Sequence, residues 1–268
     1  MTLPPPPRIL AIAGSDSSGG AGIQADIKTI TMLGGYAMTA ITAITAQNTA
    51  GVQGVEPISP AMVAQQIASC TSDIGVDAIK IGMLHDGAVI AAVAAALEGV
   101  TVPIVLDPVM IATSGAALID PGAVAAMREL LFPAATLLTP NLPELAALAG
   151  RSFDGVAAMT AAAEELAKAS GAAVLAKGGH GEGARVTDVL VVLGEAPLAF
   201  DHRRIDTRHT HGTGCTLSSA IATLLGRGLP LAEAVGQARH FVFEAIRAAP
   251  GYGAGHGPLG HQAVRAAD

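Results

Sequence analysis

A short glycine-rich segment in the last quarter of the chain has the composition of an anion-binding site. It reads Thr210-His211-Gly212-Thr213-Gly214-Cys215 and leads directly into an apolar stretch. Glycines at a helix start let successive backbone N–H groups point at one spot, and the positive end of the helix dipole favours negative charge there. Such an anion hole would stabilise the charge on a phosphoryl group in transfer. We therefore expect Gly212, Thr213 and Gly214 to hold an anion.

Cys215 falls in the first turn of the helix expected after this segment. A helix N-terminus lowers the pKa of a nearby thiol, which makes Cys215 a candidate base in the transfer. The alternative is a buried cysteine that packs as a small apolar side chain. The sequence favours the functional interpretation and leaves both open.

Oxygen-bearing side chains follow two of the apolar runs. Asp107 comes directly after Leu106, and Asn141 and Glu144 come shortly after Leu138. Mg²⁺ takes oxygen ligands and retains several waters, so two or three such groups suffice to hold it. Asn141 and Glu144 also have the spacing of a helix-capping pair, and Asp107 has the position of a turn cap. These structural roles are compatible with metal binding.

Three further polar groups stand at the ends of apolar runs. Lys177 precedes Gly178-Gly179 and is a point charge suited to a phosphate, although Lys-Gly-Gly also forms simple turns. Gln47 can donate and accept in one plane, as the edge of an aminopyrimidine requires, or it can merely cap a strand. Asp26 lies on the helix expected after the glycine-rich turn 14–22 and is a candidate to face a ligand bound at that turn. The alternative is a solvated aspartate on the protein surface.

Alternating apolar runs and helical stretches provide the elements that would position these groups. A mainly parallel sheet with helices on both faces is expected, and its ligands should lie beyond the carboxyl ends of the strands. Residues 186–200 have the pattern of an antiparallel hairpin at a sheet edge. The expected strands are 9–13, 37–46, 78–81, 103–106, 136–138 and 172–176, and the expected helices are 23–33, 60–72, 88–97, 122–131, 156–170, 213–226 and 231–248.

Composition limits the class of protein. Apolar residues make up 51% of the 268 residues and charged residues 14%, which predicts one folded domain over residues 8–268 after a proline-rich extension, residues 1–7. The net charge of −7 argues against nucleic-acid binding. No apolar run reaches the roughly 20 residues that span a bilayer. The two cysteines, Cys70 and Cys215, show no disulfide or metal spacing, so we expect a reducing, cytoplasmic location.

Together these motifs resemble the ribokinase superfamily, and within it the bacterial hydroxymethylpyrimidine/phosphomethylpyrimidine kinases of thiamine biosynthesis. The resemblance runs through nearly the whole chain in order and spacing. Its motifs are Ile12-Ala13-Gly14-Ser15-Asp16, Gly19-Gly20-Ala21-Gly22-Ile23-Gln24-Ala25-Asp26, Lys80-Ile81-Gly82-Met83-Leu84, Leu106-Asp107-Pro108-Val109-Met110, Thr139-Pro140-Asn141-Leu142-Pro143-Glu144, Lys177-Gly178-Gly179-His180, the segment 210–216 and Gly255-His256-Gly257-Pro258.

The resemblance implies a ribokinase-like three-layer fold, ATP as co-substrate, Mg²⁺, a small-molecule pyrimidine substrate and a homodimer. The pyrimidine pocket would be lined by Gly14, Ala21, Asp26, Gln47, Met83 and Val109. Residues 212–215 would form the anion hole, Lys177 and Thr210 would contact the ATP phosphates, and Asp107, Asn141 and Glu144 would hold Mg²⁺. Gln47 stands where some members have Glu.

Members of this family transfer phosphate twice, first to the hydroxymethyl group and then to the resulting phosphate. A pyridoxal kinase of the same fold, or one enzyme with both activities, is the nearest alternative. A non-catalytic pyrimidine sensor is the alternative from another class, and it would be expected to lack a phosphate or metal residue. The sequence gives no clear signal for the adenine pocket, which we expect near the last two helices.

Overall fold

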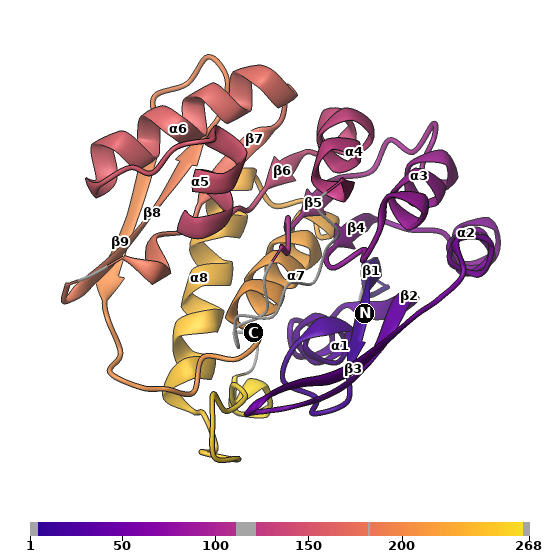
Figure 1. Ribbon diagram of the computed structural model, residues 1–268, viewed down its shortest axis with the longest axis horizontal. Coiled ribbons are helices and arrows are strands. Elements are labelled where there is room, and N and C mark those ends of the chain that lie inside the picture. The colour runs from indigo at the N-terminus through magenta and orange to yellow at the C-terminus, as the bar shows by residue number, and fades with distance from the viewer. Residues whose placement is uncertain (1–4, 111–121, 182, 265–268) are drawn as a thin grey trace.

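The computed structural model describes residues 5–110, 122–181 and 183–264, and the strands in these residues form one nine-stranded sheet (Figure 1). Along the sheet the order is β3-β2-β1-β4-β5-β6-β7-β8-β9. The strands are β1 (Arg8–Asp16), β2 (Tyr36–Asn48), β3 (Gly51–Pro57), β4 (Ala78–Ile81), β5 (Ile104–Leu106), β6 (Leu137–Leu138), β7 (Ala173–Ala176), β8 (Arg185–Val191) and β9 (Leu198–Arg203).

The middle of the sheet is parallel and both edges are antiparallel. Strands β2, β1, β4, β5, β6 and β7 pair in parallel. Strands β8 and β9 form the predicted antiparallel hairpin at one edge. Strand β3 adds a second antiparallel edge beside β2, which we did not predict. Because β3 is largely exposed, its sequence carries no buried apolar run to reveal it.

Helices cover both faces of the sheet, as predicted. The α-helices are α1 (Gly22–Met32), α2 (Pro60–Ser69), α3 (Gly87–Ala96), α4 (Ala123–Leu130), α5 (Leu142–Ala149), α6 (Gly155–Ser170), α7 (Thr213–Gly226) and α8 (Leu231–Arg247). Helices α1, α7 and α8 share a core on one face, and α2 to α6 share a core on the other. No helix in these ranges is long and apolar enough to cross a membrane.

Strand β1 shows why the central strands are apolar throughout. Ile9 and Ala11 pack toward the α1, α7 and α8 core, whereas Leu10 and Ile12 pack toward the opposite core. All four are completely buried, because successive side chains of a strand point to opposite faces and both faces carry helices.

The helix predicted over 60–72 ends earlier than expected. Helix α2 stops at Ser69, and Cys70–Ile74 forms a wider π-helical turn. The hydroxyl groups of Thr71 and Ser72 donate to backbone carbonyls one turn earlier, which competes with regular helical bonding. The prediction followed apolar spacing alone and missed this competition.

Candidate active site

A cavity of about 710 Å³ opens at the carboxyl ends of the parallel strands. We divide it into three regions. The Gln47 end lies beside β2 and is lined by Thr45, Gln47, Met83 and Val109. The transfer region lies at the start of α7 and is lined by Asp107, Glu144, Lys177 and residues 212–215. The α8 end is lined by Leu217, Val242, Phe243 and Ile246.

Gly212 shapes the start of α7. It is the N-cap of the helix and has φ +86°, in the left-handed region that favours glycine. A Cβ atom there would lie 1.8 Å from the carbonyl oxygen of Gly20, so the two loops approach too closely for any side chain. The Thr213 N–H donates to the carbonyl of Thr210 at 3.2 Å, whereas Gly214 and Cys215 have no earlier helical turn to bind, so their N–H groups can face an anion in the cavity.

Lys177 and Asp107 form an ion pair beside this helix start. The Lys177 ammonium donates to Oδ1 of Asp107 at 2.6 Å, and the Thr139 hydroxyl donates to the same oxygen at 2.9 Å. A Cβ atom on Gly214 would lie 3.1 Å from Oδ2 of Asp107 and 3.3 Å from Nζ of Lys177. Opposite charges therefore meet directly at the anion hole, with the lysine available to a phosphate.

Asn141 and Glu144 form the predicted capping box at the start of α5. The Glu144 N–H donates to the Asn141 side chain at 2.9 Å, and the Asn141 N–H donates to Oε2 of Glu144 at 2.8 Å. Burial raises the pKa of Glu144 to about 7, although Lys177 opposes this rise, and the charge of Asp107 adds to it. The backbone N–H of Met110 also bonds to this carboxylate, and this bond, like that from Asn141, lowers the pKa of Glu144.

The oxygens near the transfer region suit a hydrated divalent cation. Asp107 and Glu144 line one cavity, and their mutual repulsion is of the kind that a cation relieves. Within the residues that the structure describes, no group of three or more His, Cys, Asp or Glu side chains could hold a metal by itself. The donor set therefore fits Mg²⁺ bound mainly through water and phosphate oxygens.

Cys215 has a raised pKa, which corrects our expectation. Burial of the thiol raises its pKa to about 11; Lys80 opposes this, while Asp26 and Asp107 reinforce it. Desolvation therefore outweighs the helix dipole, and the thiol is neutral near pH 7. Its side chain still lines the cavity.

Asp26 lies beneath the cavity and does not line it. Its carboxylate is completely buried, accepts from Nζ of Lys80 at 2.9 and 3.0 Å and accepts from the Ser219 hydroxyl at 2.6 Å. It is therefore neither the pocket residue that the resemblance implied nor a solvated surface aspartate. A charge this deeply buried requires a partner, and Lys80 arrives from β4, 54 residues away.

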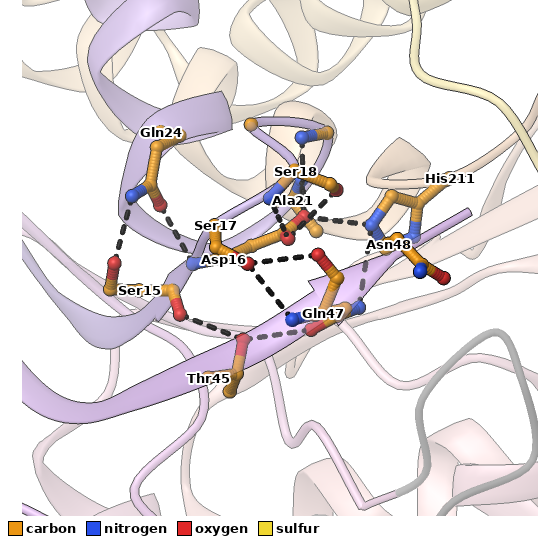
Figure 2. Close-up of polar contacts among 12 residues, drawn as sticks. Ser15, Asp16, Ser17, Ser18, Ala21, Gln24, Thr45, Gln47, Asn48 and His211 are labelled. Carbon is orange, nitrogen blue, oxygen red and sulfur yellow. Dashed lines mark hydrogen bonds and ion pairs between the residues drawn. The ribbon is translucent and has the colours of Figure 1, made fainter. Parts of the chain in front are cut away.

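Asp16, His211 and Gln47 form a polar network at the Gln47 end (Figure 2). Asp16 accepts from the N–H groups of Gly20 and Ala21 and from Nε2 of His211, the last at 2.8 Å. Burial alone would raise the pKa of Asp16, but bonds from His211, Ser18 and Ala21 outweigh it and lower the pKa to about 2. Our prediction gave no role to Asp16 or His211, although both stand within quoted motifs.

Gln47 reaches the cavity with help from an irregularity in the sheet. The β2–β3 register shifts between Ala46 and Gln47, and such a bulge redirects the side chains beside it. The side-chain nitrogen of Gln47 lies 3.4 Å from Nε2 of His211, and its oxygen lies 3.1 Å from the Thr45 hydroxyl. Gln47 therefore stands between two polar neighbours at the cavity wall.

The α8 end contains a second network that the sequence did not reveal. Arg239 donates to Asp188 at 2.6 Å and to Nδ1 of His202 at 2.7 Å. Because arginine can only donate, His202 must carry its proton on Nε2. Burial and the charge of Arg239 lower the pKa of His202, so it stays neutral. The ring of Phe243 contacts His202 edge-on at a centroid distance of 5.4 Å.

Most residues selected from the sequence meet in this one cavity. The cavity wall includes Ala21, Gln47, Met83, Asp107, Val109, Asn141, Glu144, Lys177, Thr210 and residues 212–215. Gly14 and Asp26 lie outside that wall. Gly14 instead lies under Met83, where an added Cβ would sit 3.2 Å from its sulfur.

The three-layer fold and the helix-start anion hole define a small-molecule kinase of ribokinase-like fold. The family model described as phosphomethylpyrimidine kinase matches residues 16–260, so the chain belongs to that family.

Two curated relatives and one solved structure illustrate the similarity. The hydroxymethylpyrimidine/phosphomethylpyrimidine kinase of Rhizobium meliloti is 49% identical over 255 residues, covering 94% of this chain and 96% of that protein. The thiamine biosynthesis bifunctional protein ThiED of Geobacter sulfurreducens is 48% identical over 94% of this chain, which spans about half (52%) of that longer protein. An ADP complex of Bacillus subtilis pyridoxal kinase has a TM-score of 0.88 at 37% identity, covering 96% of this chain and 98% of that one.

Proposed function

We propose that the protein phosphorylates 4-amino-5-hydroxymethyl-2-methylpyrimidine with ATP, first to the monophosphate and then to the diphosphate, in thiamine biosynthesis. The observation that carries this proposal is one cavity that joins a carboxamide, Gln47, to the anion hole at the start of α7. The relatives that are named for this activity are similar along the whole kinase chain.

The Gln47 end suits an aminopyrimidine ring. Met83 and Val109 provide apolar walls, and Gln47 offers a donor and an acceptor in one plane. A pyrimidine with an amino group beside a ring nitrogen presents the complementary pair on one edge. This end would bind the ring while its hydroxymethyl group extends toward Cys215.

The α8 end suits the nucleoside of ATP. Leu217, Val242 and Phe243 provide an apolar surface, and the neutral His202 adds a polar group at the wall. A similar solved kinase binds ADP, which supports a nucleotide at this position. The ATP phosphates would then extend toward Lys177, Thr210 and the start of α7.

Residues of the transfer region would neutralise and align the phosphoryl group. The N–H groups of Gly214 and Cys215 and the ammonium of Lys177 would stabilise its negative charge. Asp107 and Glu144, with Asn141 holding Glu144 in place, would hold Mg²⁺ through water. When bound, Mg²⁺ would screen the charge on the phosphate oxygens.

The two transfers need different help from the protein. The alcohol loses a proton in the first transfer, whereas the second begins from an oxygen that is already anionic. Because the Cys215 thiol is neutral near pH 7, we assign it to the lining of the transfer region instead of to a preformed base. A loose phosphoryl-transfer transition state requires mainly alignment and charge neutralisation.

A coupled assay of ADP release tests the proposed function. It would compare the hydroxymethylpyrimidine, its monophosphate and pyridoxal as phosphate acceptors. We expect turnover of both pyrimidines, with the diphosphate as final product. No turnover of either pyrimidine would refute the proposal.

Pyridoxal is a second candidate substrate, because a pyridoxal kinase is among the similar solved structures. A pyridine ring lacks the amino group next to a ring nitrogen, so it would use Gln47 less completely. We therefore expect lower kcat/KM for pyridoxal than for the pyrimidine in the same assay.

We also propose a homodimer, with the cytoplasm as its location. The strand pair β2–β3 exposes Ile44 and Val55, at 50% and 38% of their surface, which would suit contact with a second copy. Light scattering of the purified protein tests the dimer, and a monomer at micromolar concentration would contradict it.

A further inference from the structure

Asp16 can act only as a hydrogen-bond acceptor. Oδ1 accepts from the N–H and the hydroxyl of Ser18 at 2.9 and 2.8 Å, and Oδ2 accepts from the N–H groups of Ala21 and Gly20 at 2.8 and 3.2 Å. Backbone N–H groups only donate, so a proton on this carboxyl would displace at least one of these bonds. The lowered pKa of Asp16 agrees with a permanently ionised carboxylate.

His211 must therefore carry a proton on Nε2. This nitrogen lies 2.8 Å from Oδ2 of Asp16, and only an N–H can bond to an ionised oxygen. The imidazole has little freedom to turn away. It is 95% buried, an added Cβ on Gly20 would lie 2.4 Å from its ring, and its own backbone N–H donates to Gly257 at 3.1 Å.

Gln47 faces the same nitrogen of His211. With the amide nitrogen 3.4 Å from Nε2, two donors oppose each other (Figure 2). A half-turn of the amide about its last bond exchanges its oxygen and nitrogen without moving any other group. The oxygen of Gln47 then accepts from His211, and the amide nitrogen faces Thr45.

Thr45 is able to accept from that nitrogen. Its hydroxyl donates to the backbone carbonyl of Ser15 at 2.9 Å, which leaves a lone pair for Gln47. After the half-turn, the Nε2–H of His211 is shared between the Asp16 carboxylate and the Gln47 oxygen, and the Gln47 NH₂ group faces an acceptor on Thr45, so no two donors oppose each other.

We propose that His211, fixed by Asp16, is a positioning residue that sets the direction of the Gln47 amide, with the carbonyl toward His211 and the NH₂ group toward Thr45. This direction decides how a ring binds. The carbonyl would accept from the amino group of the substrate, and the NH₂ group would donate to the neighbouring ring nitrogen.

The direction of the amide also decides where the reacting group lies. This step rests on the proposed function. In the substrate, the hydroxymethyl group is attached next to the carbon that bears the amino group. An amino group bound on the His211 side therefore brings the hydroxymethyl group toward Gly212 and the anion hole. The opposite amide direction would turn the ring over and carry the hydroxymethyl group away from it.

The experiment compares the aminopyrimidine with its pyrimidin-4-one analogue. In the analogue a carbonyl replaces the amino group and the neighbouring ring nitrogen carries a proton, so its donor and acceptor are exchanged. We expect the wild-type protein to prefer the aminopyrimidine by about a hundredfold in kcat/KM.

Two substitutions at position 211 test the role of the imidazole. In His211→Met the donor is lost, the amide of Gln47 can adopt either direction, and we expect the preference to fall to about tenfold or less. In His211→Gln an N–H remains within reach of Asp16 and Gln47, so most of the preference should return. The KM for ATP should be similar in both variants.

A folded His211→Met variant that keeps the full preference would overturn the inference, since a merely structural role leaves discrimination unchanged. If that variant does not fold, Thr45→Val tests the same network from the other side, and an unchanged preference there would also overturn it. If the wild-type protein phosphorylates the aminopyrimidine without preference over the analogue, only this inference fails. If it phosphorylates neither, the proposed function fails and this inference falls with it.

Discussion

Cys215 shows two opposing effects on one residue. The helix start favours a thiolate, whereas burial beside Asp26 and Asp107 favours the thiol, and burial prevails. The anion hole itself is made of backbone N–H groups, which do not depend on the side chain at this position.

We predict that Cys215→Ala slows both phosphoryl transfers by similar factors, each below about tenfold, because the backbone donors remain. Steady-state rates with the alcohol and with the monophosphate, measured separately, check this. A much larger loss in the first transfer than in the second would instead identify the thiol as a base.

Lys177 lies beside the anion hole, since an added Cβ on Gly214 would lie 3.3 Å from its Nζ. We predict that Lys177→Met lowers kcat by at least about a hundredfold, because it removes charge neutralisation at the phosphoryl group. Lys168→Met on the outer side of α6 is the control and should leave kcat unchanged. Equal activity of the two variants would show that Lys177 serves only to pair with Asp107.

At the scale of elements, the start of α7 is held by loops that are distant in sequence. Gly20 contacts Gly212, and the carbonyl of Gly257 accepts from the N–H of His211. The C-terminal glycine-rich segment also reaches the turn between β2 and β3, since the His256 N–H donates to the carbonyl of Thr49. Close backbone approach explains why glycines recur around this helix start.

Substitutions of two glycines at opposite ends of α7 distinguish the effect of steric crowding from that of backbone strain. Gly212 and Gly228 both have φ +86°, but only Gly212 would place a Cβ against a neighbour. We predict that Gly228→Ala costs about 1 kcal/mol of unfolding free energy, whereas Gly212→Ala costs clearly more and also abolishes turnover. Denaturant unfolding and the ADP-release assay measure both. If the two variants lost similar amounts of unfolding free energy, the Gly20 loop would have to move aside to accommodate a Cβ atom at position 212.

Sequence patterns predicted the elements that are buried on both faces or clearly bounded. Helix α7 begins at Thr213 and ends at Gly226, as predicted, because glycines flank an apolar stretch. Strand β3 was missed because its residues are mostly exposed, and the end of α2 was misplaced because Thr71 and Ser72 alter the bonding of its last turn. The spacing of apolar residues indicates which side chains are buried. Neither strand β3 nor the end of α2 is determined by buried side chains.

At the scale of the whole molecule, the buried Lys80–Asp26 pair joins β4 to α1 and, through Ser219, to α7. Both charged side chains are inaccessible to solvent. The pair therefore stabilises the packing of three elements beneath the cavity only as long as both partners are present.

We predict that Lys80→Met destabilises the protein by about 3–5 kcal/mol, since it leaves a buried carboxylate without a partner. The double variant Lys80→Met/Asp26→Leu should recover part of this loss. Urea unfolding of the two variants tests the pair. A double variant no more stable than Lys80→Met would contradict the prediction.

Asp16 links stability to acid pH. Its pKa falls from an ordinary value of 3.8 to about 2 in the folded protein. A carboxyl with a lowered folded-state pKa stabilises the protein above its unfolded-state pKa, and this contribution is lost as the pH falls through the folded-state pKa. The contribution of Asp16 to the unfolding free energy is about 2 kcal/mol; it is present above about pH 4 and is lost as the pH falls toward 2.

We predict that Asp16→Asn weakens the dependence of unfolding free energy on pH between pH 5 and pH 2. Thermal unfolding across this range measures it, with Asp206→Asn in the exposed loop before α7 as control. A slope equal to that of the wild type would show that Asp16 is not preferentially ionised in the folded state.

The sequence by itself determined the alternation of strands and helices, the glycine-rich start of α7 and the residues that line the transfer region of the cavity. These are local properties, carried by apolar spacing and by polar groups that directly follow strands. The tertiary structure decided the rest: the neutral thiol of Cys215, the burial of Asp26 against Lys80, the contact between Asp16 and His211, and the network at the α8 end. Each depends on desolvation or on a partner far along the chain, 195 residues away for Asp16 and His211, and local sequence cannot report either.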